Sequence, residues 1–326
     1  MLDSVSYKSH LRSVVDLSII IVNWNGGSDI LECLDSLRVC GLLDNGEVLV
    51  VDNASEDGSP ELVQRAFPQV VLLETGANLG FARAANLGWQ QARGDYVLFL
   101  NPDTHVPAGA LEQTLTYLRS HPAVGLTGVK LLNHDSSLQV SCWNFLSLPL
   151  LFFDNLLRLP FIPRPLAGRF IHRLWDHGET REVDWVCGAC MLMRRAVLEE
   201  VGGFSEDYFM YGEDMDLCYK VRRRGYSVVY YADAAIIHYG NRSGAKRWAE
   251  RREAEIVRAE LTFLRKHRGR FSWLLFRTLA AGTFLLKSAF FSLRSRNGSK
   301  EEWKREAARY WQMVKVCREC APTSAP

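Results

Sequence analysis

Apolar runs alternate with segments of helical spacing along the first part of the chain. Continuous apolar runs that end in polar residues occur at 17–23, 47–55, 70–74 and 95–103. Runs of this kind are typical of strands that are buried on both faces. Between the runs, helical spacing predicts helices over 29–39, up to Phe67, over 80–92 and over 108–119, with a further strand over 125–132. The alternation predicts an α/β fold, in which helices flank a mostly parallel, mixed sheet.

A later segment, residues 204–226, joins aromatic, acidic and basic residues in the order FSEDYFMYGEDMDLCYKVRRRGY. Its pattern predicts a helix with Leu217 and Val221 on the buried face and Gly225 just past the end. The first turn would carry the carboxylates Glu213, Asp214 and Asp216. The helix dipole stabilises negative charge in a first turn, so an ordinary helix start would explain these acids. A catalytic base is the other interpretation.

Composition places the chain among folded, soluble enzymes. Of its 326 residues 48% are apolar and 23% are charged, which suits one large domain with appendages. The charge is unevenly distributed, with 19 Lys and Arg against 29 Asp and Glu in residues 1–241, but 20 against 8 in residues 242–320. An acidic body is therefore followed by a basic tail.

The eight cysteines indicate reduced thiols in a cytoplasmic protein, because the first fifteen residues lack the apolar run of a signal peptide. Cys187 with Cys190, and Cys317 with Cys320, have the C-x-x-C spacing. The two pairs lie far apart in the sequence without a paired histidine pattern, so a zinc site is not favoured.

Polar residues gather where the predicted strands end, which is where open sheets of this kind bind ligands. They are Asp52, Asn53, Asn101 and Asp103. The first turn reads NWNGG and lacks the third glycine of a dinucleotide-binding loop, so an oxidoreductase is not favoured. Asp103 follows a buried strand in a turn fixed by proline, and suits Mg²⁺ or Mn²⁺, which prefer oxygen ligands and bridge phosphates. A plain Asn-Pro-Asp turn is the alternative.

Seven pieces in order, SIIIVNWNG, VVDNAS, NLGFARAAN, GDYVLFLNPD, DWVCGACMLMRR, FMYGEDMDLCYKVRRRGY and IIHYGNRSG, resemble family 2 glycosyltransferases of the GT-A fold. The resemblance covers roughly residues 16–244 and is nearest to bacterial rhamnosyltransferases that act on cell-surface polysaccharide. It implies a GT-A nucleotide-diphospho-sugar transferase fold with a helical C-terminal extension.

The resemblance also implies roles for individual residues. Asp52 would hold the nucleotide base or ribose, with Asn23 and Trp24 beside it. Asp103 matches the last aspartate of the metal-binding D-x-D motif, where Asn101 replaces the first acid and metal affinity is expected to be lower. His238 matches a histidine that completes the metal site in some relatives, although a hydrogen-bonded structural histidine is the alternative. Asp214 would be the general base, supported by Glu213.

Further donor contacts are expected from Asn53 and from the loop 78–86, which would begin a helix suited to anions. Within that loop Asn78 and Arg83 are candidates, and a solvated helix face is the alternative for Arg83. Trp185 would stack on the donor or the acceptor unless it is ordinary core. Gly188 would let the backbone approach a sugar closely.

Three regions are predicted: an N-terminal tail over 1–15, a catalytic domain over 16–244 and a basic, amphipathic helical extension over 245–326. The stretch 145–171 contains four prolines, which exclude a spanning helix, and is interpreted as an exposed flap on the acceptor side, with a packed excursion under the sheet as the alternative. In the extension, Arg270, Arg277, Lys287 and Arg294 fall within a sector of about 120° on a helix over 270–296. That pattern predicts a helix lying on an anionic membrane surface, with core packing or an oligomer contact as the alternative. No motif for nucleic acid accompanies it.

The expected function is an inverting glycosyltransferase, since there is one base and no covalent nucleophile. The donor would be a nucleotide-diphosphate sugar, dTDP-rhamnose or a UDP-sugar, used with Mg²⁺ or Mn²⁺. The acceptor would be a glycan or polyprenyl-linked glycan, at the cytoplasmic face of the cell membrane. The alternative is an inactive, nucleotide-sugar-binding scaffold in a membrane-associated assembly.

Overall fold

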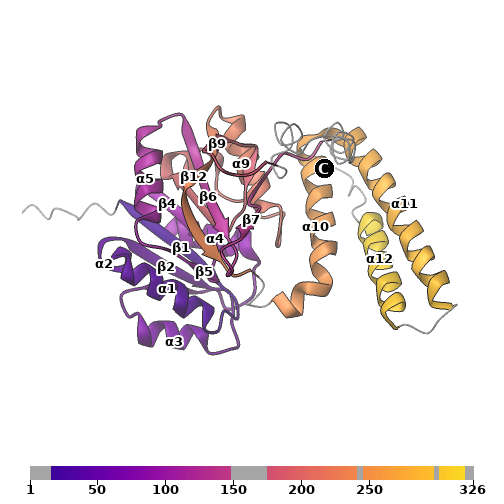
Figure 1. Ribbon diagram of the computed structural model, residues 1–326, viewed down its shortest axis with the longest axis horizontal. Coiled ribbons are helices and arrows are strands. Elements are labelled where there is room, and N and C mark those ends of the chain that lie inside the picture. Colours follow the sequence, from indigo (N-terminus) through magenta and orange to yellow (C-terminus); the bar gives the residue numbers. More distant parts are fainter. Residues whose placement is uncertain (1–15, 148–174, 241–244, 297–300, 320–326) are drawn as a thin grey trace, which may run out of the picture.

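The computed structural model describes residues 16–147, 175–240, 245–296 and 301–319. An α/β body is followed by three long helices, and Figure 1 shows the last two running antiparallel beside that body. The N-terminal tail and most of the predicted flap over 145–171 lie outside the described residues.

The body is built on a ten-stranded mixed sheet whose main path is β3-β2-β1-β4-β11-β6-β12-β5, with β7 beside β6 and β9 beside β12. Neighbours from β3 to β4 are parallel, as are β6 and β12, while β11 is antiparallel to both β4 and β6. This confirms the predicted mixed sheet. The strands are β1 (Leu17–Asn23), β2 (Glu47–Asp52), β3 (Val71–Glu74), β4 (Tyr96–Leu100), β5 (Thr104–His105), β6 (Val124–Leu132), β7 (Leu138–Gln139), β9 (Arg181–Glu182), β11 (Cys190–Arg194) and β12 (Ser227–His238). A separate two-stranded sheet joins β8 (Cys142–Trp143) and β10 (Trp185–Val186).

Helices cover both faces of the sheet, which is why its central strands are apolar throughout. Along β1, Ile19 and Ile21 point into one hydrophobic cluster, and Ile20 and Val22 point into the other. The first cluster includes side chains of α1, α3 and α5, and the second includes α4, α8 and α9. The helices of the body are α1 (Asp29–Val39), α2 (Leu42–Asn45), α3 (Ser59–Ala66), α4 (Phe81–Gln91), α5 (Ala110–Ser120), α8 (Arg195–Val201) and α9 (Glu213–Arg223).

The predicted acidic helix is α9. Glu213, Asp214 and Asp216 lie in its first turn, and Leu217 and Val221 are buried. Gly225 follows the helix with φ of 90°, a left-handed conformation that glycine adopts at little cost. These local predictions are confirmed.

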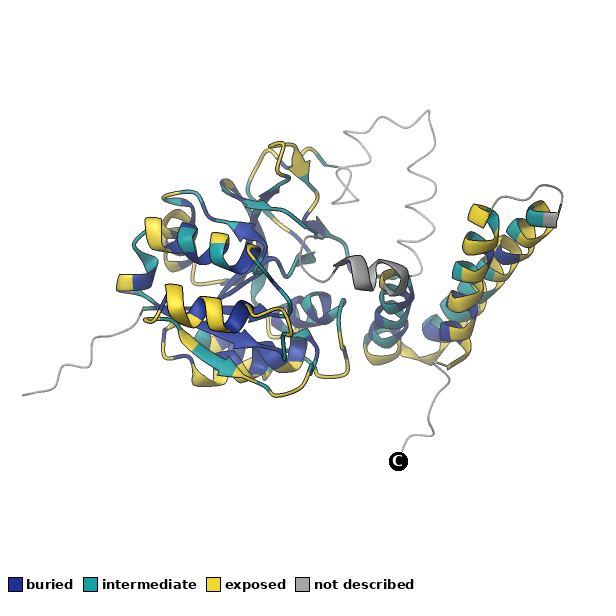
Figure 2. Cartoon of the chain, turned by 90° about the horizontal axis from the view of Figure 1, so that it is seen from below, coloured by how far each residue is buried: buried dark blue, intermediate teal, exposed yellow. Residues whose placement is uncertain are grey.

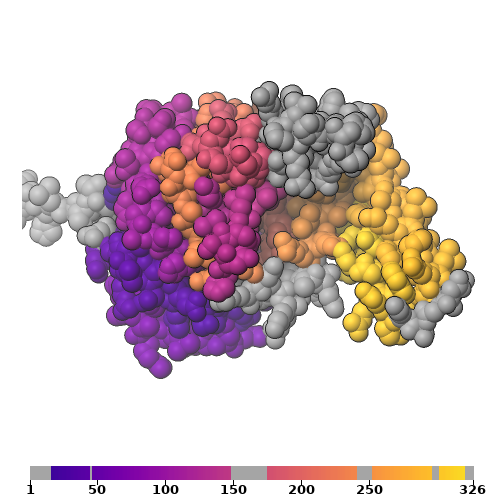
Figure 3. Space-filling view, viewed as in Figure 1, coloured from indigo at the N-terminus to yellow at the C-terminus, as the bar shows by residue number. Residues whose placement is uncertain are grey.

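The C-terminal helices are α10 (Ala245–His267), α11 (Gly269–Arg296) and α12 (Glu301–Glu319). Side chains on α10, among them Val257, Leu261 and Phe263, belong to the same hydrophobic cluster as β1 and α9. In contrast, α11 is largely exposed along one side, as the yellow colour in Figure 2 shows. Figure 3 shows α11 and α12 as a yellow lobe beside the body.

The basic side of α11 faces α12, while binding of this helix to a membrane surface stays a prediction. Arg277 donates to the carbonyl of Cys317, Lys287 lies over the ring of Tyr310, and Arg294 lies over the ring of Trp303. The reason is that α12 offers these cations aromatic faces and the carbonyl groups of its own C-terminal end. The opposite, apolar side of α11 is the exposed one. Its large exposed side chains are Phe271, Leu274, Leu275, Leu279, Leu285, Leu286, Phe290 and Leu293, here called the α11 stripe.

Candidate active site

The ends of β1 and β2 hold a buried hydrogen-bond network around Asp52. Asn23 and Asp52 are register partners, and the Asn23 amide Nδ2 donates to Asp52 Oδ1 at 2.9 Å. The hydroxyl and backbone amide of Ser55 also donate to the Asp52 carboxylate, at 2.6 and 3.0 Å. Asp52 is therefore a fixed, buried acceptor at the mouth of the sheet. Trp24, the next residue after β1, is half-buried.

Asn53 and Asn78 fix the loop that precedes α4. Asn53 Nδ2 donates to Asn78 Oδ1 at 3.0 Å, and Asn53 Oδ1 accepts from the backbone amide of Leu79 at 2.8 Å. Asn78 Oδ1 in turn accepts from the amide of Gly80 at 3.0 Å. These contacts give both residues a positioning role, and direct contact with a donor stays a prediction for them.

Arg83 lies on the exposed side of α4. Its guanidinium pairs with Glu206 at 3.2 Å, and both side chains are more than half exposed. This surface pair matches the solvated helix face that was the alternative for Arg83, so its contact with a diphosphate stays a prediction.

Asp103 and His238 are brought together by strand pairing. β5 pairs antiparallel with the end of β12, so that Thr104 lies opposite His238. His238 Nε2 then lies 3.3 Å from Asp103 Oδ1 and 3.3 Å from the side-chain nitrogen Nδ2 of Asn101. Gln139 Oε1, 2.6 Å from His238 Nδ1, accepts its proton in the tautomer that leaves Nε2 with a free electron pair.

This donor set fits a divalent cation. One carboxylate and one imidazole nitrogen, oriented by an outer hydrogen bond, leave positions for the phosphate oxygens of a substrate, as Mg²⁺ and Mn²⁺ sites commonly do. Among the described residues there is no cluster of three or more His, Cys, Asp or Glu that could hold a metal. Any cation held here would thus depend on ligands from the substrate.

The carboxylate of Asp214 faces the backbone that enters β11. Its Oδ2 accepts from the amide of Gly188 at 3.0 Å, and its Oδ1 accepts from the amide of Met215 at 2.8 Å. The neighbouring carbonyl of Ala189 accepts from the amide of Asn101 at 3.0 Å. The segment 187–190 is therefore hydrogen-bonded to Asn101, two residues before Asp103, and to Asp214 at the start of α9.

Cys187, the first residue of the segment 187–190, is affected by carboxylates from both neighbouring regions. The pKa of its thiol is raised to about 12, first by burial and then by the negative charges of Asp214, Glu213 and Asp103. Asp214 and Asp103, which lie 111 positions apart in the sequence, therefore both lie close enough to Cys187 to affect its thiol.

Burial raises the pKa of both carboxyl groups at the start of α9. For Glu213 the charge of Asp214 raises it further, and its Oε2 has no hydrogen-bond partner in the described chain. For Asp214 the backbone amides of Gly188 and Met215 oppose the effect of burial. Glu213 is consequently the group that keeps its proton, and Asp214 is the one that ionises.

Trp185 stacks on Trp143 across the small sheet, with ring centroids 4.4 Å apart, and its Nε1 donates to the carbonyl of Asn144 at 3.1 Å. Both rings are half-buried, and Trp185 also packs on the hydrophobic core. Stacking on a sugar stays a prediction for Trp185. Trp143 carried no signal in the sequence, because only the pairing of β8 with β10 reveals it.

For two further residues, the sequence did not reveal the contacts that the structure shows. Gln139, which orients His238, lies in a strand of two residues with no recognisable pattern. Asp216 was recognised as part of the acidic turn, but its spacing from Asp214 could not show that it faces away from Gly188 toward α10.

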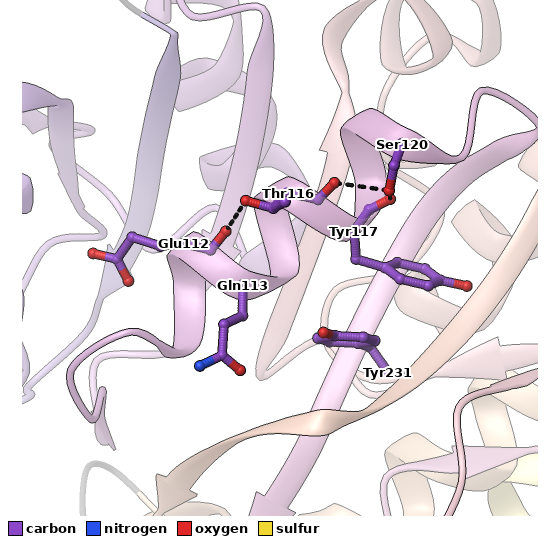
Figure 4. A pocket seen from close by; sticks show the side chains of 6 residues that line it. All are labelled: Glu112, Gln113, Thr116, Tyr117, Ser120 and Tyr231. Atoms are coloured by element: carbon purple, nitrogen blue, oxygen red, sulfur yellow. Dashed lines mark hydrogen bonds between the residues drawn. The ribbon is translucent and has the colours of Figure 1, made fainter.

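A shallow depression elsewhere on the body is lined by one side of α5 and by Tyr231 of β12. Figure 4 shows the rings of Tyr117 and Tyr231 lying face to face, with centroids 4.6 Å apart. Its other lining residues are Glu112, Gln113, Thr116 and Ser120. It contains none of the candidate site residues.

The fold is that of GT-A nucleotide-sugar transferases. A mannosyltransferase from Pyrobaculum calidifontis, solved with GDP-Man and Mn²⁺, superimposes with a TM-score of 0.55 at 20% identity, covering 94% of this chain and 87% of the other. GalNAc-T7, solved with UDP, GalNAc and Mn²⁺, has a TM-score of 0.55 at 13% identity and covers 94% of this chain and 56% of the other. The predicted fold is therefore confirmed.

The chain belongs to glycosyl transferase family 2, whose model matches residues 18–202. A second model, glycosyl transferase family group 2, matches residues 172–299 and so extends through α10 into α11. These matches confirm the family that the sequence motifs indicate.

Two curated relatives are rhamnosyltransferases. The chain is 34% identical to the N-acetylglucosaminyl-diphospho-decaprenol L-rhamnosyltransferase of Mycobacterium tuberculosis, over 59% of this chain and 66% of that protein. It is 28% identical to the rhamnosyltransferase WbbL of Escherichia coli, over 51% of this chain and 63% of that protein. The matched region thus spans about two thirds of each relative.

Proposed function

We propose that this protein is an inverting glycosyltransferase that moves a sugar from a nucleoside-diphosphate donor to a hydroxyl group of an acceptor. The observation that supports the proposal is that the segment 187–190 is hydrogen-bonded both to Asp214 and to Asn101, and that His238 lies beside Asn101 and Asp103. Donor diphosphate and acceptor hydroxyl would then approach the transferred sugar from opposite sides.

Asp103 and His238 would hold a divalent cation, Mg²⁺ or Mn²⁺, together with phosphate oxygens of the donor. When bound, such a cation neutralises negative charge on the leaving diphosphate. Asp52 and Asn23 would hold the base or ribose of the nucleotide at the ends of β1 and β2. The buried network around Asp52 keeps its carboxylate in place before a ligand arrives.

Asp214 would take the proton of the acceptor hydroxyl as the oxygen attacks the anomeric carbon. The bond from that carbon to the diphosphate oxygen breaks in the same displacement, and its electron pair leaves with the diphosphate. Removal of the proton by a placed carboxylate contributes typically about 10²–10⁴-fold to such a step. Direct displacement from the opposite side inverts the anomeric configuration.

For the donor sugar we propose rhamnose carried on a nucleoside diphosphate, with dTDP-rhamnose as the first candidate and a UDP-sugar as the second. For the acceptor we propose a glycan linked to polyprenyl diphosphate. Both proposals draw on the names of the two rhamnosyltransferase relatives.

We further propose that the protein acts at the cytoplasmic face of the cell membrane. The support is the α11 stripe, because a long row of exposed Leu and Phe is costly to leave in water. Within the described chain one helix, Gly269–Ser295, has the length and mean hydropathy, 1.4, of a membrane-crossing helix, and 6% of its most apolar window is buried. We place it along the surface, since Arg277 and Lys287 interrupt its sequence.

Thermal-shift measurements on the purified protein with a panel of nucleotide sugars, each with and without Mn²⁺, test the proposal. We expect one donor to stabilise the protein in a metal-dependent manner and to support transfer to a lipid-linked glycan. Donor binding with no transfer to any acceptor would favour the scaffold alternative, and binding of no nucleotide would reject both.

A further inference from the structure

The third carboxylate of α9, Asp216, is completely buried and faces the C-terminal helix α10. Its Oδ1 accepts from His267 Nε2 at 2.7 Å and from the hydroxyl of Tyr208 at 3.2 Å, and Lys266 Nζ lies 3.3 Å away. Its Oδ2 accepts from the hydroxyl of Ser205. Four side chains from two other segments thus converge on a single carboxylate.

These contacts join three segments that are distant in sequence. The loop 203–209 supplies Ser205 and Tyr208, α9 supplies Asp216, and the last turn of α10 supplies Lys266 and His267. The same loop is tied to the start of α4, where the amide of Phe81 donates to the carbonyl of Phe209 at 2.9 Å. The Asp216 cluster therefore joins the donor side of the body to the C-terminal helices.

The cluster is held as an ionised group. Burial alone would raise the pKa of Asp216, but hydrogen bonds from His267 and Ser205, with the charges of Lys266 and Lys220, outweigh burial and lower it to about 2. A buried charge is tolerated only when it is paired and hydrogen-bonded, so loss of one partner leaves the others poorly compensated.

A second contact places α10 directly against the start of α9. Gly212, which precedes Glu213, has φ of 82°, and a β-carbon at this position would lie 2.8 Å from Cβ of Ala259. Tyr211 before it also has a positive φ, 68°. The backbone that leads into the acidic turn thus has an unusual conformation, and α10 packs against it.

We propose that Asp216 is a positioning residue for the catalytic base, through which the last turn of α10 holds the first turn of α9 so that Asp214 stays on the amide of Gly188. The inference rests on the proposed function only in that Asp214 is the base. It makes α10 part of the catalytic centre, although the sequence places that helix in a separate extension.

The test compares three variants of the full-length chain. His267→Leu removes the donor to Asp216, and His267→Gln retains a side-chain nitrogen that can donate. The matched control is Glu253→Gln, which breaks the ion pair between α10 and Arg309 of α12, away from α9. Amide hydrogen exchange at Gly188, with Ile20 of β1 as an internal reference, reports the hydrogen bond to Asp214 without requiring activity.

In His267→Leu we expect exchange at Gly188 to be at least ~10-fold faster while exchange at Ile20 is unchanged, as for a local opening. Single-turnover transfer should fall by a similar factor, with donor affinity retained. His267→Gln should restore most of both, and Glu253→Gln should resemble the wild type. Unchanged exchange at Gly188 in His267→Leu, or an equal change in Glu253→Gln, would overturn the inference. Absence of transfer by the wild type would instead count against the proposed function, and the exchange measurement would still test the positioning role.

Discussion

At the scale of single residues, two adjacent carboxyl groups of the same turn have different hydrogen-bond surroundings. Glu213 is buried and Asp214 is half-buried. Only Asp214 accepts two backbone amides, whereas one oxygen of Glu213 has no partner in the described chain. Hydrogen bonds to a carboxylate favour its charged form. The backbone amides of Gly188 and Met215 therefore favour the charged form of Asp214, while burial and the charge of Asp214 favour the protonated form of Glu213.

Replacement of Asp214 by Asn should lower single-turnover transfer by roughly 10²-fold or more, because the proton-accepting charge is lost while the shape is kept. Donor affinity, measured by calorimetry, should stay within a few fold. Glu213→Gln should have the milder effect, since an uncharged group replaces an uncharged group. Near wild-type turnover in Asp214→Asn would remove this residue as the base.

The rate of transfer should also depend on pH in a defined direction. The base acts when deprotonated, so turnover falls as pH is lowered through its pKa, and burial raises the pKa of Asp214. We therefore expect the acidic limb of the pH–rate profile to have its midpoint above about 4, the ordinary value for aspartate. A midpoint at or below that value would show that another group is titrating.

Metal dependence can be tested through Gln139, which contacts His238 but is not itself one of the two proposed metal ligands, Asp103 and His238. Asp103→Ala should abolish transfer. Gln139→Leu should weaken the apparent affinity for Mn²⁺ by roughly 10–100-fold, as loss of an outer hydrogen bond to a metal-ligating histidine commonly does. Titration of activity with Mn²⁺ measures both, and saturating Mn²⁺ should restore only the Gln139 variant. Full activity of Asp103→Ala in a chelator would exclude a metal site here.

At the scale of elements, two helix glycines should respond to the same substitution with opposite signs. A β-carbon on Gly88 of α4 would lie 2.6 Å from Cγ2 of Ile20, whereas on Gly282 of α11 nothing lies within 4 Å. Gly282→Ala should stabilise the protein by up to about 1 kcal/mol through helix propensity. Gly88→Ala should destabilise it by about 1–3 kcal/mol, because overpacking against β1 outweighs that gain. Urea unfolding measures both changes, and equal shifts in the two variants would contradict the prediction.

The sequence predicted the helices and strands well wherever burial of one or both faces produces a regular pattern of apolar residues. The run at β1, the helical spacing at α1 and the acidic turn with a terminal glycine at α9 were all found, because each pattern has a local physical cause. Polar residues at strand ends were also found, since topology places them at one edge. The contact of Gln139 with His238 and the partners of Asp216 were not predicted, because these contacts join distant segments whose residues carry no local pattern.

The sequence could not show how the two sides of α11 are used. Periodicity correctly separated Arg277, Lys287 and Arg294 from the apolar residues, but it could not show which side α12 would cover. An aromatic helix can cover a basic side as readily as an apolar one, because cations stack on aromatic rings. Which side of α11 is covered depends on the residues of α12, so the sequence of α11 alone cannot predict it.

At the scale of the whole molecule, the α11 stripe predicts binding to lipid vesicles. The double variant Leu279→Lys, Leu286→Lys should lower binding in a sedimentation assay by at least ~10-fold, since each buried Leu contributes roughly 1.5–3 kcal/mol. Leu62→Lys, at an exposed leucine of α3, is the matched control and should bind as the wild type. Because the basic side of α11 faces α12, we expect only a weak dependence on salt. Equal binding by the double variant and the wild type would exclude the stripe as the lipid contact.

The packing of α10 against α9 also determines when the enzyme can first become active during its synthesis. The chain is synthesised from its N-terminus, and the last strand of the sheet ends at His238. The two partners of Asp216 on α10, Lys266 and His267, are synthesised only later. If Asp216 positions the base as proposed, the nascent chain can form its donor side before it has a placed base. Catalysis would then begin only after the whole of α10 has emerged from the ribosome and docked on α9.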